Sequence, residues 1–200
     1  MRIVLASKSP RRREILSFLG LHFDIVSADA DESSAITDPA LLVRELALRK
    51  GRATRELLRA SGQWNDDTLI IAADTVVAVG DEILGKPHDA ADAKRMLSLL
   101  SDTAHHVISG ISLLYGDREI ADFDDTLVHF SHMTPQEIDW YVASGEPMDK
   151  AGAYAIQGLA SIFIRKLDGC YFNVVGLPVH KLNALLTAEL GMGIVSLSQQ

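Results

Sequence analysis

Residues 68–79 read Thr-Leu-Ile-Ile-Ala-Ala-Asp-Thr-Val-Val-Ala-Val, an aliphatic and β-branched run interrupted by Asp74 and Thr75. Such a run is typical of a strand that is covered on both faces. It is about half as long as a membrane span and contains a carboxylate, so it does not predict a transmembrane helix. The segment therefore predicts a buried strand inside a sheet.

Alternating strand and helix patterns extend from this run in both directions. Ser9 and Pro10 predict a helix start, and Gly20 predicts its end. Asp38-Pro39 opens a longer helix that runs toward residue 60, after a polar loop at 28–37. Further strands are expected at 2–6, 23–27, 82–84, 106–115, 119–130, 161–166 and 171–174, and further helices after 89, at 134–143 and at 178–190. This order predicts an α/β fold with a mixed, twisted central sheet flanked by helices.

Length and composition favour one globular domain over residues 1–200. Hydrophobic residues make up 48% of the chain, which is enough to fill a core. The net charge of −8 disfavours binding to a nucleic-acid backbone or an anionic membrane surface. One cysteine, Cys170, allows no intrachain disulfide. With no signal-peptide pattern at the N-terminus, we expect a cytoplasmic protein.

Asp74 is the most informative position in the sequence. It stands between Ile70–Ala73 and Val76–Val79, where an ionised carboxylate without compensation would cost several kcal/mol. The carboxylate must be protonated, hydrogen-bonded, paired with a cation or open to a cleft. The sequence leaves two alternatives open, a functional site with a metal ion or a positioned water, and a structural salt bridge to an Arg or Lys.

Arg11, Arg12 and Arg13 fall in the first turn of the predicted helix. The positive end of the helix dipole disfavours cations there, so a negative group is expected nearby. Free backbone N–H groups and guanidinium groups together favour phosphate. The alternative is a solvated basic patch, and at helical spacing at least one of the three arginines must point away from any single pocket.

Two lysines are further candidates. Lys50 falls within the apolar stripe of the long helix, defined by Val43, Leu46, Ala47, Ala53 and Leu57, although a lysine stem can also pass apolar neighbours to reach water. Lys86 follows Gly85, and residues 80–86 resemble the start of a P-loop. Pro87 stands where Ser or Thr would bind magnesium, which excludes a P-loop ATPase.

Several other signals carry less information. His105 and His106 are adjacent, so in a strand they face opposite sides and we expect structural roles. The sequence holds no Gly-x-Ser-x-Gly, His-Glu-x-x-His or Gly-x-Gly-x-x-Gly motif. The common serine hydrolase, zinc protease and dinucleotide-binding classes therefore lack support.

Separated segments of the chain resemble the Maf family, also called septum formation proteins. The likeness covers nearly the whole chain in the right order, and its motifs are residues 7–12, 73–76, 85–87, 149–158 and 175–178. The resemblance implies an elongated ITPase-like α/β domain with two lobes around a deep cleft. It also implies a nucleoside triphosphate pyrophosphatase that needs a divalent cation, Mg²⁺ or Mn²⁺, and that forms a homodimer.

The resemblance implies a role for individual residues as well. It implies that Asp74 is the proton acceptor and that Arg12, Thr75 and Gln157 govern nucleotide choice, in a combination like that of the branch acting on dTTP and UTP. Glu32, Lys50 and Lys86 also match family site positions. This chain departs from the family pattern at two positions. Lys8 stands where a small residue is common, and Ala155 stands where a glycine is usual. If position 155 needs a positive φ, the placement of Gln157 is affected.

Residues and resemblance together give one hypothesis. The phosphates of a nucleoside triphosphate would lie against Arg11, Arg12, Lys50, Lys86 and the helix start. Glu32 and Asp74 would hold the metal ion, and Asp74 would direct water at the α-phosphorus. Gln157 can donate to and accept from the edge of uracil or thymine. The alternative function is a nucleotide-binding regulator of septum formation that acts through protein interaction with little catalysis.

Overall fold

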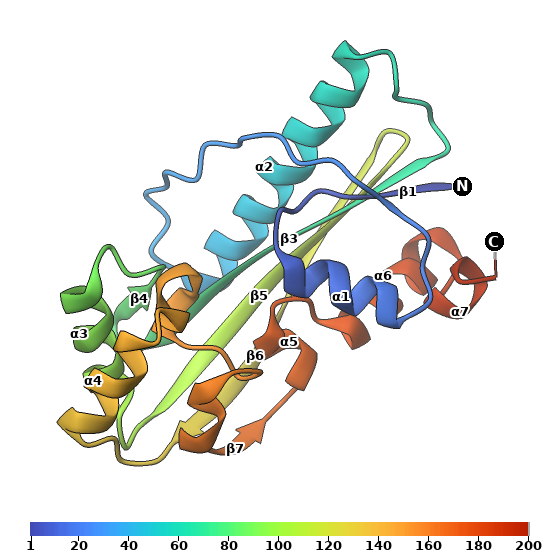
Figure 1. The fold of residues 1–200 in the computed structure, drawn as a ribbon. Helices are drawn as coiled ribbons and strands as arrows, with labels where there is room; N and C mark the ends of the chain where they lie inside the picture. The colour runs from blue at the N-terminus through green and yellow to red at the C-terminus, as the bar shows by residue number, and fades with distance from the viewer. Residues whose placement is uncertain (200) are drawn as a thin grey trace. The chain divides into compact units, whose positions relative to one another are not determined.

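The computed structural model of the chain describes residues 1–199 and shows an α/β protein (Figure 1). Its strands are β1 (Arg2–Leu5), β2 (Asp24–Ile25), β3 (Thr68–Val79), β4 (Glu82–Leu84), β5 (Ala104–Tyr115), β6 (Arg118–Phe130) and β7 (Ile164–Asp168). Its α-helices are α1 (Pro10–Phe18), α2 (Pro39–Ala60), α3 (Ala90–Leu100), α4 (Pro135–Ala143), α5 (Tyr171–Val175), α6 (Val179–Leu190) and α7 (Ile194–Leu197). Three short 3₁₀ helices complete the described elements: η1 (Glu146–Asp149), η2 (Ala151–Ala153) and η3 (Leu159–Phe163).

The strands form one mixed sheet in the order β2-β1-β3-β5-β6-β7, with β4 paired to β3. β1 runs parallel to β2 and β3, with Val4 opposite Ile70, whereas β3–β4 and β6–β7 are antiparallel. The predicted strand at 68–79 is confirmed with both of its ends, and its residues from Thr68 to Asp74 are all buried. The predicted mixed α/β class is thus confirmed.

Local signals explain most of the element boundaries. Asp38 caps α2 by accepting from Leu41 N at 2.8 Å, and Asp89 caps α3 in the same way from Asp92 N. Thr134 and Glu137 form a reciprocal capping box at the start of α4. α1 begins at Pro10 after Ser9, and Gly20 adopts φ 74° just beyond its end.

The chain divides into two compact units. The first contains Met1–Asp74, Ser109–Asp124 and Gly176–Gln200, and the second contains Thr75–Ile108 and Asp125–Val175. In the first unit, β1, β3, β5 and α2 contribute to a buried cluster of Val4, Ala6, Leu58, Ile70, Ala72 and Leu114. In the second, α3 and α4 pack with the 3₁₀ helices around a larger apolar core that includes Phe130 and Tyr141. Among residues 1–199, no helix is both long and apolar enough to cross a membrane.

Two predicted segments are wrong in type or position. Residues 171–174 form part of helix α5 and not a strand. Asn173 is fully buried and its amide donates to Val107 O at 2.8 Å and Thr126 Oγ1 at 2.9 Å, which holds the segment against β5 and β6 by a side chain. The strand predicted at 161–166 starts only at Ile164, because η3 continues to Phe163.

The buried face of α2 also differs from the predicted stripe. Val43, Leu46 and Ala47 are buried as expected, whereas Leu57 is 45% exposed and Leu58 is 1% exposed. The stripe passes through Gly51, where an added Cβ would lie 2.5 Å from Leu114 Cδ1. The glycine lets the helix approach β5 closely, and Leu58 is buried because it continues the three- and four-residue spacing from Gly51 through Thr54.

Candidate functional site

Asp74 lies within β3 and is only 9% exposed. It is a charged residue between two uncharged neighbours in a buried strand. Its Oδ1 accepts a hydrogen bond from the ammonium of Lys50, which is itself largely shielded from water on α2. The buried carboxylate is therefore compensated by a cation, as the sequence requires.

Lys50 joins two carboxylates. Its Nζ lies 2.9 Å from Glu32 Oε1 and also contacts Asp74, so one ammonium holds an exposed loop residue and a buried strand residue. We call Glu32, Lys50 and Asp74 the acidic cluster. The cluster carries two negative charges and one positive charge, and its two carboxylates meet at the Lys50 ammonium.

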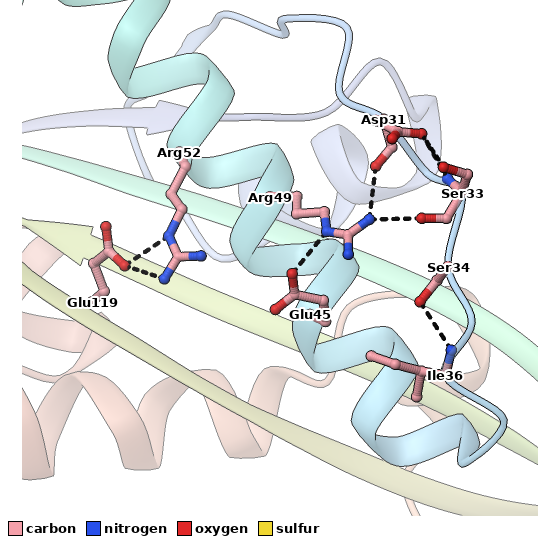
Figure 2. Close-up of polar contacts among 8 residues, drawn as sticks. All are labelled: Asp31, Ser33, Ser34, Ile36, Glu45, Arg49, Arg52 and Glu119. Atoms are coloured by element: carbon pink, nitrogen blue, oxygen red, sulfur yellow. Dashed lines mark hydrogen bonds and ion pairs between the residues drawn. The ribbon is translucent and has the colours of Figure 1, made fainter.

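Arg49 fixes the loop on either side of Glu32, and Figure 2 shows its hydrogen bonds to Asp31 and Ser33. Arg49 Nη1 donates to Ser33 O at 2.7 Å and to Asp31 O at 3.3 Å, on either side of Glu32, while its Nε donates to Glu45 at 2.7 Å. Hydrogen bonds from Ser33 lower the pKa of Asp31 and close a tight turn at the same place. Arg49 thus positions the loop around Glu32.

Arg49 was not among the site residues predicted from the sequence. The available signal was its i,i+4 spacing to Glu45 on one helix, which predicts a local ion pair. Its bonds to the carbonyls of the loop could not be read from that spacing.

Arg12 lies in the electrostatic field of the acidic cluster. Its half-buried side chain donates to Gly176 O at 2.8 Å and to Ser7 Oγ at 3.3 Å. Burial lowers the pKa of Arg12, and the negative charges of Asp74 and Glu32 oppose that effect. The expectation of negative groups near the arginine run is therefore met at Arg12. Arg11 is also half-buried, whereas Arg13 is exposed, in keeping with the expected fan of directions.

Three predicted site residues belong to the second unit. Thr75 follows Asp74 in β3 and is half-buried, Lys86 is exposed after β4, and Gln157 lies in a turn after η2. Their roles stay predictions. Ala155 is not among the positive-φ residues of the described chain, so its replacement of a glycine does not strain the turn before Gln157. The left-handed positions in this region are Gly152 and Ala153.

The donor set of the acidic cluster suits a hard divalent cation. Within residues 1–199, no group of three or more His, Cys, Asp or Glu side chains gathers as a metal site. Two converging carboxylates, Glu32 and Asp74, are nevertheless what a Mg²⁺-type ion uses when substrate phosphates and water supply its other ligands. The oxygen donors of Glu32 and Asp74 therefore fit such an ion.

The structure is thus that of an α/β protein with a mixed sheet, in which a buried strand carboxylate is paired with a lysine. Comparison with known proteins gives the family. A family model described as Maf-like protein matches residues 2–189, and the chain belongs to this family.

Three relatives have the name dTTP/UTP pyrophosphatase. The protein from Symbiobacterium thermophilum is 45% identical over 186 residues, which is 92% of each chain. That from Alkaliphilus oremlandii is 44% identical and covers 96% of this chain and 98% of its own. That from Bacillus cereus is 43% identical over 90% of this chain and 92% of its own. The chain thus resembles these relatives over nearly their full length.

Proposed function

We propose that the protein is a nucleoside triphosphate pyrophosphatase that hydrolyses dTTP and UTP to the nucleoside monophosphate and pyrophosphate. The observation that carries the proposal is the acidic cluster, in which Lys50 joins Asp74 and Glu32 within the field of Arg12. The names of the relatives support the choice of reaction and substrate. They also favour an enzyme over the alternative of a regulator of septum formation.

In this mechanism Asp74 is the general base. A water molecule attacks the α-phosphorus, its proton passes to an Asp74 carboxylate oxygen, and the bond from the α-phosphorus to the bridging oxygen breaks. Pyrophosphate leaves with the electron pair of that bond. The shielding of Asp74 from bulk water strengthens the electrostatic effect of every nearby charge on this step.

The cations of the chain bind the phosphates. Arg11 and Arg12 at the start of α1 offer guanidinium groups, and Lys50 and Lys86 offer ammonium groups, to the oxygens of the triphosphate. Lys50 also keeps the charges of the acidic cluster compensated before substrate arrives. A Mg²⁺ or Mn²⁺ ion held by Glu32 and Asp74 would supply further positive charge against the phosphate oxygens when bound.

Gln157 and Thr75 select the base of the nucleotide in this proposal. The Gln157 amide can accept from N3–H and donate to O4 of uracil or thymine. Guanine offers a similar pair of groups, so the size of the pocket must exclude purines. We also propose that residues 1–200 form one catalytic domain, which works in the cytoplasm as a homodimer.

A substrate panel tests the proposal. The purified protein is incubated with each common nucleoside triphosphate and Mg²⁺, Mn²⁺ or Co²⁺, and pyrophosphate release is measured. Rapid release from dTTP and UTP is expected. Tight binding of nucleotide without turnover would instead favour the regulator.

A further inference from the structure

Two side chains of the second unit hold both ends of the turn that carries Gln157. Tyr141 of α4 accepts at its Oη from Ala155 N at 3.2 Å, and Glu146 of η1 accepts at Oε2 from Leu159 N at 3.1 Å. The two side chains are also bonded to each other, because Tyr141 Oη donates to Glu146 Oε1 at 2.8 Å. We call Tyr141 and Glu146 the loop clamp.

The turn between the clamped ends is itself closed by a hydrogen bond. Gly158 N donates to Ala155 O at 3.2 Å, which makes Gln157 the third residue of a four-residue turn. Tyr141 is fully buried, whereas Gln157 keeps part of its surface open to solvent. The clamp therefore fixes the backbone from inside the unit and leaves the amide accessible to a ligand.

Gly158 gives independent support for the clamp. Its φ of −125° is open to any residue, so backbone conformation does not require glycine here. An added Cβ would instead lie 2.2 Å from Glu146 Oε1 and 2.4 Å from Oε2. Any larger residue at this position would therefore displace the Glu146 carboxylate from the turn.

At neutral pH the hydrogen bond between the two clamp side chains has one direction, from the Tyr141 hydroxyl to the Glu146 carboxylate. Burial, and then the hydrogen bond to Glu146, raise the pKa of Tyr141 well above its ordinary value. The phenol stays protonated and donates to the carboxylate, while its oxygen remains an acceptor for Ala155 N. The Tyr141 hydroxyl and both carboxylate oxygens of Glu146 therefore each have a hydrogen-bond partner.

We propose that Tyr141 and Glu146 are positioning residues for base selection, which fix the turn so that the Gln157 amide meets the pyrimidine edge in one register. This inference rests on the proposed function, in which Gln157 contacts the base. A misplacement of about 1 Å can lower the rate by about a hundredfold. Release of the turn by Glu146→Gln should therefore lower kcat/KM for dTTP about tenfold or more, with a much smaller effect on dCTP.

A double-mutant cycle tests the coupling. We would measure the ratio of kcat/KM for dTTP to that for dCTP in the full-length wild type, in Glu146→Gln, in Gln157→Ala and in the double variant. The Glu146→Gln change should reduce the ratio in the wild-type background and have no further effect in the Gln157→Ala background. The matched control is Glu137→Gln on α4, which removes an exposed carboxylate of the capping box and should leave the ratio at its wild-type value.

Gly158→Ala provides a second variant that retains the carboxylate, and it should reproduce the loss of selectivity if Glu146→Gln does not fold. Hydrogen exchange reports on the clamp without activity, since the amides of Ala155 and Leu159 should exchange faster in either variant. An unchanged ratio, unchanged exchange, or independent effects in the double variant would overturn the inference alone. A folded wild type that releases pyrophosphate from no triphosphate would overturn the proposed function instead.

Discussion

Replacement of Asp74 by asparagine removes the charge of the proposed base and nearly conserves its shape. The amide oxygen of the new side chain can still accept from Lys50, and Lys50 retains Glu32 as a charged partner at 2.9 Å. Loss of one partner from a buried ion pair typically costs about 3–5 kcal/mol. Because a second carboxylate remains and Lys50 is 19% exposed, we expect a smaller loss, about 1–2 kcal/mol.

A stability loss of this size has little effect on the amount of folded protein. For a chain of 200 residues it corresponds to a fall in Tm of about 2–8 °C. A domain of ordinary stability, about 5–15 kcal/mol, would still be almost entirely folded at 25 °C. Loss of a general base lowers the rate by about 10²–10⁴-fold, so a fall of that size would report on chemistry and not on unfolding.

The assay is pyrophosphate release from dTTP with excess metal ion. It is run at least about 20 °C below the Tm of the variant. At about 4 °C per kcal/mol, this leaves the variant a free energy of unfolding of about 5 kcal/mol. The control is Asp122→Asn, which removes a carboxylate that pairs with Lys181 at 3.0 Å on the surface of the same unit. It should retain wild-type turnover. If Asp74→Asn keeps turnover within about tenfold of wild type, Asp74 is not the base, since general-base loss costs more than this.

Three further substitutions test other parts of the site and the core. Gln157→Glu should weaken use of dTTP and UTP, because two acceptors would then face the base O4; an unchanged substrate profile would count against this contact. Arg49→Lys should raise by about tenfold the Mn²⁺ concentration that gives half-maximal pyrophosphate release from dTTP, because it releases the loop at Glu32; the same change at Arg52, which pairs with Glu119, should not. Burial lowers the pKa of His105 from 6.5 to about 3, so its contribution to stability is present above pH 6.5 and is lost as the pH falls. His105→Gln should therefore show a smaller fall in the urea midpoint between about pH 7 and pH 5 than the wild type, and equal falls would contradict the assignment.

Local signals in the sequence predicted the elements that depend on neighbouring residues. The caps at Asp38, Asp89 and Thr134 and the strand at 68–79 appear where the sequence places them, because a cap or a continuous apolar run is satisfied within a few residues. Helix α5 was missed because the bonds of Asn173 that hold it go to distant strands.

The residue types of the site were also evident from sequence. A carboxylate within a buried strand needs a cation or hydrogen-bond donors in any fold. Asp74 was therefore identifiable from the free-energy cost of burying its charge. Lys50 was a candidate because it falls within the apolar stripe of its helix, and the family motifs then added Glu32 and Gln157.

The sequence by itself thus determined the fold class, the position of the buried charge and the family. Only the tertiary structure decided that Lys50, 24 residues away from Asp74, is its partner, and that Arg49 and the loop clamp hold the segments around Glu32 and Gln157. The physical reason is that such contacts depend on how helices, strands and loops pack together, and sequence spacing carries information only about neighbours within one element.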